Sequence, residues 1–214
     1  MNLFRDNNIC CYELDYHNKE INQEFIDAHQ WGCENLDKLT RLPTGGHDVS
    51  LVFPYVLLKA QGFDNICNFI DSLNGWVYPF VRIFSLDTNN EFMAHVDSNV
   101  HGLFEDIPKG HIISASINFT AIPSTDKTIW YRQSGKGFVH PWDVYYGKDV
   151  PLDVIDEFVV SNKPALLRIG QWHSISNSST TSNRIVASFL FNYTIPWDTA
   201  VNLLVKENML LPRY

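Results

Sequence analysis

The chain has 214 residues, of which 45% are hydrophobic and 19% charged, and its formal net charge at pH 7 is −8. A chain of this length can build its own core, so one globular domain is predicted, without need of disulfides or metal for folding. The acidic balance and the lack of any Lys/Arg run argue against an extended nucleic-acid groove.

The chain begins without an apolar leader and has no apolar run of about 18 residues, which predicts an intracellular, cytoplasmic protein with no membrane span. The four cysteines, which form no Cys-X-X-Cys pair, are predicted to be buried free thiols rather than zinc ligands. They are Cys10, Cys11, Cys33 and Cys67.

Residues 1–75 show mixed character and are expected to form a helical and mixed support region. Weak alternation over 10–16 predicts a strand, and apolar residues at helical spacing predict a helix over 18–39. A second helix is predicted over 63–73, with Asp64 as its N-cap and Gly75 as its stop.

Residues 76–195 contain short runs rich in Val, Ile, Phe, Tyr and Thr, separated by turn residues, and are expected to form the main body of the domain. Eight short strands without long helices between them indicate an all-β sandwich or barrel, with the two helices packed on one outer face. The Ser/Thr/Asn-rich run 174–183 is interpreted as a loop, and the tail 196–214 as carrying one short helix near 200–206. The predicted strands cover 77–86, 91–96, 111–121, 128–132, 137–139, 153–160, 165–169 and 184–193.

Four side chains form the most specific chemical pattern: His95 and Asp97 in one short run, then His173, then Arg184. Two imidazoles and one carboxylate can occupy one face of an octahedral iron and leave the opposite face open. A guanidinium nearby can hold the far carboxylate of an organic acid bound at that open face.

The run 114–120 alternates between small polar residues at even positions and apolar residues at odd positions. Its polar face, with Ser116 and Asn118, either lines a wet cavity or is exposed on a one-sided sheet. Tyr131 either offers its phenol to the same pocket or is a core aromatic. Arg82 and Arg168 lie in apolar runs and need either a partner or an exposed face.

Further candidates lie close in sequence to the metal-binding residues. Asn99 and His101 follow the first pair on an expected rim loop, where they either contact substrate or are ordinary polar loop residues. Trp172 either packs beside the metal or contacts substrate.

The sequence resembles the Fe(II)/2-oxoglutarate-dependent oxygenases, which are built on a double-stranded β-helix of the cupin type, and it resembles a small phage or bacterial branch of unknown substrate more than any member with a known substrate. The resemblance covers about 76–193 and includes the runs 81–86, 92–97, 112–120, 128–131 and 164–191. It implies Fe(II) held by His95, Asp97 and His173, with 2-oxoglutarate held through its C5 carboxylate by Arg184.

The resemblance also implies an activity: hydroxylation of a C–H bond of a small molecule or protein side chain, with O2 consumed and succinate and CO2 released. A phage-encoded enzyme of this kind would act in the host cell. Asn118 and Tyr131 are the further cosubstrate candidates.

One position departs from the family pattern. Many members have Ser two residues after the Arg, where this chain has Val186; Ser188 shares the same strand face and is the substitute candidate. Two other hypotheses stay open. One is a metal-binding cupin of non-oxygenase activity, which keeps the metal ligands but does not need Arg184. The other is a jelly-roll binding or structural module, in which the ligands need not converge.

Overall fold

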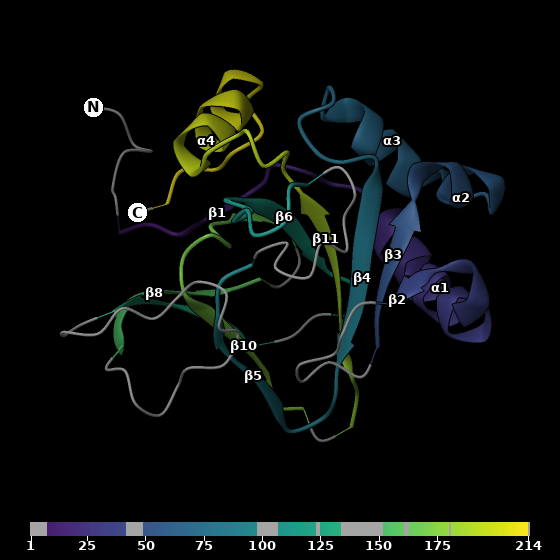
Figure 1. The fold of residues 1–214 in the computed structure, drawn as a ribbon, viewed down its shortest axis with the longest axis horizontal. Coiled ribbons are helices and arrows are strands. Elements are labelled where there is room, and N and C mark those ends of the chain that lie inside the picture. The colour runs from purple at the N-terminus through teal and green to yellow at the C-terminus, as the bar shows by residue number, and fades with distance from the viewer. Residues whose placement is uncertain are drawn as a thin grey trace.

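A computed structural model describes residues 8–41, 49–97, 107–122, 125–133, 152–160, 163–179 and 181–213, and its strands form two antiparallel sheets that face each other (Figure 1). The larger sheet contains β1 (Cys11–Glu13), β2 (Thr40–Arg41), β3 (Val49–Pro54), β4 (Phe80–Leu86), β6 (Ser116–Thr120), β9 (Ala165–Leu167) and β11 (Arg184–Leu190). The smaller sheet contains β5 (Asn90–His95), β7 (Lys127–Gln133), β8 (Leu152–Val159) and β10 (His173–Asn177).

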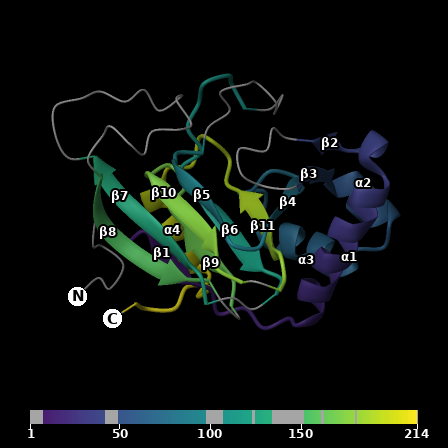
Figure 2. The same cartoon turned by 90° about the horizontal axis from the view of Figure 1, so that it is seen from below.

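The path of the chain between the sheets identifies the fold. The strand order is β1-β9-β6-β11-β4-β3-β2 in the larger sheet and β5-β10-β7-β8 in the smaller one. Among the described strands from β4 to β11, the chain therefore passes back and forth between the sheets, and of these strands only β7 and β8 follow each other in one sheet. This winding of antiparallel strands is a double-stranded β-helix, and it confirms the predicted fold class (Figure 2).

The helices pack against the outer face of the larger sheet, as predicted. They are α1 (Glu20–Glu34), α2 (Tyr55–Ala60), α3 (Asp64–Ser72) and α4 (Trp197–Lys206), with a short 3-10 turn at Leu36–Lys38. Figure 1 shows α1, α2 and α3 on the side of β3 and β4 that faces away from the smaller sheet. The α4 helix joins the same apolar cluster, where Trp197 stacks on Tyr12 of β1.

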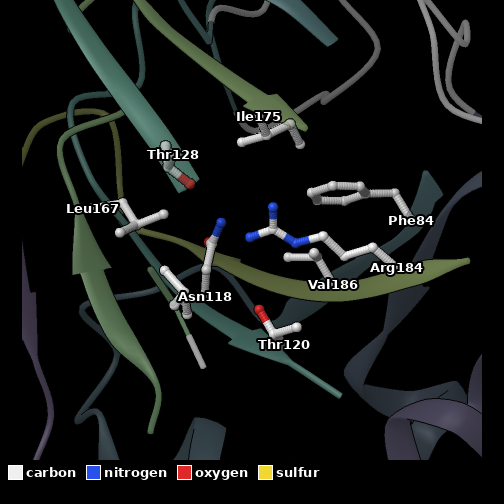
Figure 3. A pocket seen from close by; sticks show the side chains of 9 residues that line it. Phe84, Asn118, Thr120, Thr128, Leu167, Ile175, Arg184 and Val186 are labelled. Atoms are coloured by element: carbon white, nitrogen blue, oxygen red, sulfur yellow. The ribbon is translucent and has the colours of Figure 1, made fainter. Parts of the chain in front are cut away.

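Strand alternation divides the larger sheet into two faces. Odd-numbered residues of β6 and β11, such as Phe119 and Phe189, are buried against the rings of Phe25 in α1 and Phe69 in α3. Even-numbered residues of the same strands point into the space between the sheets, as Figure 3 shows for Asn118, Thr120, Arg184 and Val186.

The N-terminal region adds strands as well as helices to the body of the protein. Strand β1 pairs with β9 and β3 pairs with β4, so both extend the larger sheet beyond the strands of the β-helix. Neither β3 nor α2 was predicted, because the run 49–60 is apolar without a clear strand or helix period. The predicted helix over 18–39 ends earlier, at Glu34.

Several local predictions need correction. Asp64 is not the N-cap of α3 but its first helical residue. The N-cap is Phe63, and its side chain makes no capping hydrogen bond. The predicted loop 174–183 is wrong for its first part, because Ser174–Asn177 belong to β10 and pair with both β5 and β7. The stop after α3 does form, with Gly75 at φ +74°. The predicted strand 137–139 lies outside the described residues.

The cysteines are free, and Cys10, Cys11 and Cys67 are buried as expected, whereas Cys33 is exposed on α1. Among the helices that the structure describes, none is both long and apolar enough to cross a membrane.

Candidate metal centre and adjoining pocket

The two candidate histidines face each other across neighbouring strands of the smaller sheet. His95 ends β5 and His173 begins β10, and the two residues are direct partners in the antiparallel register. Both side chains are buried, and their ring centroids are 4.3 Å apart. Strand pairing thus brings together two histidines that lie far apart in the sequence.

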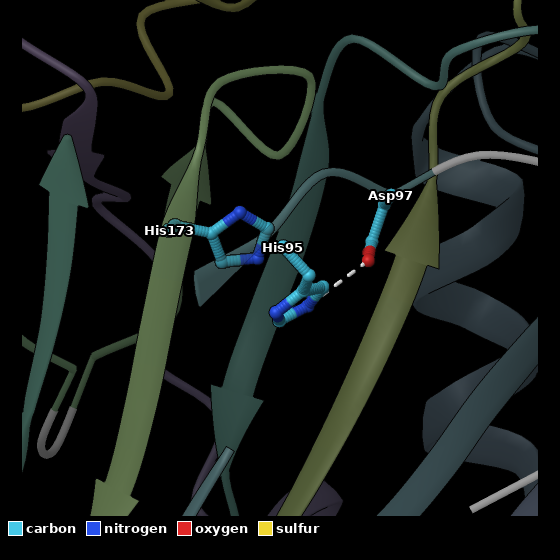
Figure 4. A group of neighbouring side chains, drawn as sticks. All are labelled: His95, Asp97 and His173. Carbon is cyan, nitrogen blue, oxygen red and sulfur yellow. Dashed lines mark ion pairs between the residues drawn. The ribbon is translucent and has the colours of Figure 1, made fainter. Parts of the chain in front are cut away.

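Asp97 completes the group from a position just after β5 (Figure 4). Its backbone is fixed at both ends, because its N–H donates to the carbonyl of Ile169 at 3.0 Å and its C=O accepts from Ile113 at 3.0 Å. The potential ligand atoms of His95, Asp97 and His173 all lie within 4.8 Å of one another. The predicted convergence of these three residues is therefore present.

Protonation in this cluster suits a cation. Burial, and next the neighbouring His95, lower the pKa of His173 to about 4, so its imidazole is neutral at pH 7. Nδ1 of His173 lies 2.9 Å from the carbonyl of Gln171 and donates to it, which leaves the lone pair of Nε2 for a metal.

Asp97 is ionised despite its burial. Burial alone raises the pKa of this carboxyl, but hydrogen bonding to His95 and the charge of Arg82 outweigh it and hold the pKa below its usual range. Nε2 of His95 lies 3.3 Å from Oδ1 of Asp97. Two imidazoles and an ionised carboxylate are together a ligand set for a divalent transition metal.

A small pocket lies between the sheets, and β10, the strand that carries His173, forms part of its wall (Figure 3). Ile175 and Thr128, which are cross-strand partners on β10 and β7, contribute to its wall. Ile175 is two residues from His173 on the same face of β10, roughly 7 Å along the strand. The lining residues are Phe84, Asn118, Thr120, Thr128, Val160, Leu167, Ile175, Arg184 and Val186.

Arg184 is the charged residue in the wall of this pocket, and it is only 4% exposed. Burial lowers its pKa to about 10, while the charge of Asp126 acts in the opposite direction, so the guanidinium is charged at neutral pH. Nη1 donates to the carbonyl of Ser176 at 2.8 Å. Nε of Arg184 and Oγ1 of Thr120 are both buried, without a hydrogen-bond partner in the described part of the chain.

The polar face of β6 lines the interior, as one of the two sequence alternatives stated. Ser116 and Thr120 are buried, so the exposed-face alternative is wrong. The hydroxyl of Ser116 donates to Oδ1 of Asn118 at 2.8 Å, which turns the Asn118 amide N–H groups toward the pocket. In Figure 3 the Asn118 amide and the Arg184 guanidinium point toward the same space.

Other predicted site residues lie elsewhere. Ser188 is buried on the inner face of β11 but does not line the pocket, whereas Val186 does. The Tyr131 hydroxyl lies 2.9 Å from Oγ of Ser174 and is likewise outside the lining. Trp172 is partly buried just before β10. Asn99 and His101 lie outside the described residues.

Sequence reasoning missed Thr120, Thr128 and the contact between Arg82 and Asp97. Thr120 had a signal, since it continues the polar alternation of Ser116 and Asn118. The other two depend on strand pairing over long sequence intervals, which a single sequence does not reveal.

No protein-family model matches the sequence, and no curated protein matches it. A prolyl hydroxylase from Trichoplax adhaerens, solved with a hypoxia inducible factor peptide, aligns over 94% of this chain and 89% of its own, with 11% identity and a TM-score of 0.48. The non-heme alpha ketoglutarate dependent epimerase SnoN of nogalamycin biosynthesis aligns over 79% and 74%, with 10% identity and a TM-score of 0.46.

Vicilin from hazelnut, Corylus avellana, also aligns, over 73% of this chain and 31% of its own, with 6% identity and a TM-score of 0.37. Similarities at this level do not distinguish one kind of protein from another, so the chemistry of the site has to do so.

Proposed function

We propose that the protein is a non-haem Fe(II)- and 2-oxoglutarate-dependent dioxygenase that hydroxylates a C–H bond of a small molecule or a protein side chain. One observation carries the proposal. A buried, charged Arg184, whose Nε has no hydrogen-bond partner in the described part of the chain, lines a pocket that shares strand β10 with a cluster of two histidines and one aspartate.

The cluster fits Fe(II). His95 and His173 would supply neutral nitrogens and Asp97 one carboxylate oxygen, and a two-histidine, one-carboxylate set with an open face is the ligand set of non-haem Fe(II) oxygenases. The hydrogen bond from Nδ1 of His173 to Gln171 fixes the ring orientation, and the two backbone hydrogen bonds of Asp97 fix the main chain that carries the carboxylate.

The pocket fits the far carboxylate of an organic diacid. The buried Nε of Arg184 has no hydrogen-bond partner in the described part of the chain, and a carboxylate that accepted from it would form a strong, charge-assisted hydrogen bond. Arg184 offers Nε, and Asn118 offers its amide N–H groups. We infer that these groups hold the C5 carboxylate of 2-oxoglutarate.

Thr120 lies beside the position that Ser occupies in many members of the family that this chain resembles. In the antiparallel register Thr120 is the direct partner of Val186, the residue that stands where those members have Ser, and the Thr120 hydroxyl has no hydrogen-bond partner among the described residues. Ser188, which sequence spacing suggested, does not line the pocket. Thr120 is therefore the better candidate to donate a hydroxyl hydrogen bond to the cosubstrate.

When bound, iron and cosubstrate supply the oxidation, in which O2 and 2-oxoglutarate yield succinate and CO2 while a substrate C–H bond becomes C–OH. The protein's own residues orient and shield the reactants. Phe84, Leu167, Ile175 and Val186 give the pocket apolar walls, which exclude water and strengthen the charge interaction at Arg184.

The other two hypotheses explain less. A metal-binding cupin of non-oxygenase activity accounts for the three ligands but gives no role to Nε of Arg184 and Oγ1 of Thr120, which have no hydrogen-bond partner in the described part of the chain. A binding or structural module gives no reason for the three ligands to converge in the interior.

Succinate release from 2-oxoglutarate tests the proposal. With Fe(II) and O2 the wild-type protein should release succinate slowly even without a prime substrate, and adding metabolites or peptides one at a time should identify the substrate by faster release. His173→Ala should abolish release. If the iron-loaded wild type released no succinate with any candidate substrate, the oxygenase proposal would be wrong.

A further inference from the structure

Arg82 is a second arginine in the interior, and the proposed chemistry above gives it no role. It lies in the middle of β4, where its register partners are Val52 of β3 and Ser188 of β11. Its side chain is 16% exposed. Burial lowers its pKa while the charge of Asp97 opposes that effect. A guanidinium in such a place needs partners to offset its lost hydration.

Three contacts hold the Arg82 side chain. Nε donates to Oγ of Ser50 at 3.1 Å, and the guanidinium carbon lies 4.9 Å from the ring centroid of Phe84. Nη1 lies 3.8 Å from Oδ2 of Asp97. The hydrogen bond and the ring fix the guanidinium from one side, so its outer edge is presented to Asp97.

The two oxygens of Asp97 therefore have different neighbours. Oδ1 lies 3.3 Å from Nε2 of His95, inside the ligand cluster, whereas Oδ2 lies on the side of Arg82. A carboxylate free to rotate could present both oxygens to a metal and so occupy an additional coordination position.

We propose that Arg82 is a positioning residue that holds Oδ2 of Asp97, so that Oδ1 alone is presented to the metal. The inference rests on the metal site of the proposed function and deepens it. One oxygen from Asp97 leaves more of the metal open for cosubstrate and O2. Residues that orient a metal ligand without binding the metal themselves typically contribute about 10- to 100-fold to metal affinity or activity.

This arrangement also gives the N-terminal region a part in the site. Ser50 is fully buried in β3, which precedes the first strand of the β-helix and pairs with it. Its hydroxyl begins a series of contacts, from Ser50 to Arg82 to Asp97, that ends at the ligand cluster. Through this series β3 supports the site rather than only widening the sheet.

Titration with Co(II), followed by visible absorption, tests the inference without relying on turnover. Arg82→Met removes a positive charge from beside the metal, which by itself would strengthen cation binding. Loss of Asp97 orientation acts the other way and should weaken Co(II) binding by about 10- to 100-fold, with a changed visible spectrum. The direction of the change therefore separates positioning from simple charge repulsion.

Ser50→Ala is the milder variant, because it keeps the charge and removes only the hydrogen bond that fixes Nε. It should weaken Co(II) binding by roughly 2- to 10-fold, as expected for one net hydrogen bond, and it decides the question if Arg82→Met fails to fold. Arg132→Met is the matched control, since Arg132 is exposed on β7 and bonds to Asn8. The control should leave affinity and spectrum unchanged.

Unchanged or tighter Co(II) binding with an unchanged spectrum, in folded Arg82→Met or in Ser50→Ala, would overturn the positioning role. Equal weakening in Arg132→Met would also overturn it, since the loss of affinity would then not depend on contact with Asp97. A different result would indicate failure of the metal site itself: wild-type protein that does not bind Co(II), or His173→Ala that binds it equally well.

Discussion

The outer and inner faces of the larger sheet are made by the same strands but have opposite characters. On the outer face, Phe119 and Phe189 meet the ring of Phe69 with centroids 5.0 and 4.9 Å apart, in edge-on contacts. The inner face carries two buried polar atoms without partners in the described part of the chain. They belong to Thr120, which follows Phe119 in β6, and to Arg184, the first residue of β11.

The contrast shows how one strand serves both stability and chemistry. Aromatic packing on the outer face contributes hydrophobic and ring-contact energy, whereas each unpaired polar atom on the inner face costs about 1 to 3 kcal/mol. A rigid outer layer therefore holds inner groups in place before any ligand arrives, which is the arrangement that a binding site needs.

The largest effect on stability should come from the outer face. Phe189→Ala should lower the free energy of unfolding by about 3 to 5 kcal/mol, because it leaves a cavity among the packed rings. Urea denaturation measures the loss. The neighbouring inner-face variant Ser188→Ala should cost less than about 1.5 kcal/mol, and equal losses from both variants would contradict the division of roles.

The largest effect on ligand binding should come from the inner cluster. His173→Ala should weaken binding of Co(II) or Fe(II) by more than roughly 100-fold, because loss of a metal ligand costs more affinity than loss of a residue that only orients a ligand. Calorimetric titration measures the affinity. Its effect on unfolding should be smaller than that of Phe189→Ala, and retained affinity would exclude His173 as a ligand.

Thr120→Val should have opposite effects on stability and function. The change preserves shape and removes an unpaired hydroxyl, so the ligand-free protein should become more stable by about 1 kcal/mol. The KM for 2-oxoglutarate should rise by about 10-fold, because a hydrogen bond to a charged group is lost. Ser188→Ala should leave this KM unchanged; a rise there instead would return the hydroxyl role to Ser188.

Residue types and local alternation predicted much of this arrangement. The sequence predicted the ligand set of His95, Asp97 and His173 because the residue types themselves determine which metal they can bind. The polar face of 114–120 was readable because a strand alternates its side chains between two faces. Both features are local in the chain.

The sequence did not predict the features that depend on strand pairing or side-chain contacts between residues distant in the chain. Strand β10 has a polar composition and is a strand because β5 and β7 pair with it on both sides. Thr120 could not be preferred over Ser188 without the register between β6 and β11. The contact from Ser50 through Arg82 to Asp97 required β3, which the sequence did not reveal as a strand.

The most direct test is an anaerobic titration of the Fe(II)-loaded protein with 2-oxoglutarate, observed in the visible range. A weak metal-to-ligand charge-transfer band should appear in the wild type and be absent in His173→Ala. In Arg184→Met the band should appear only at much higher 2-oxoglutarate concentration. Wild-type protein that holds Fe(II) but gives no band at saturating 2-oxoglutarate, or Arg184→Met that titrates like the wild type, would contradict the proposed iron and cosubstrate site.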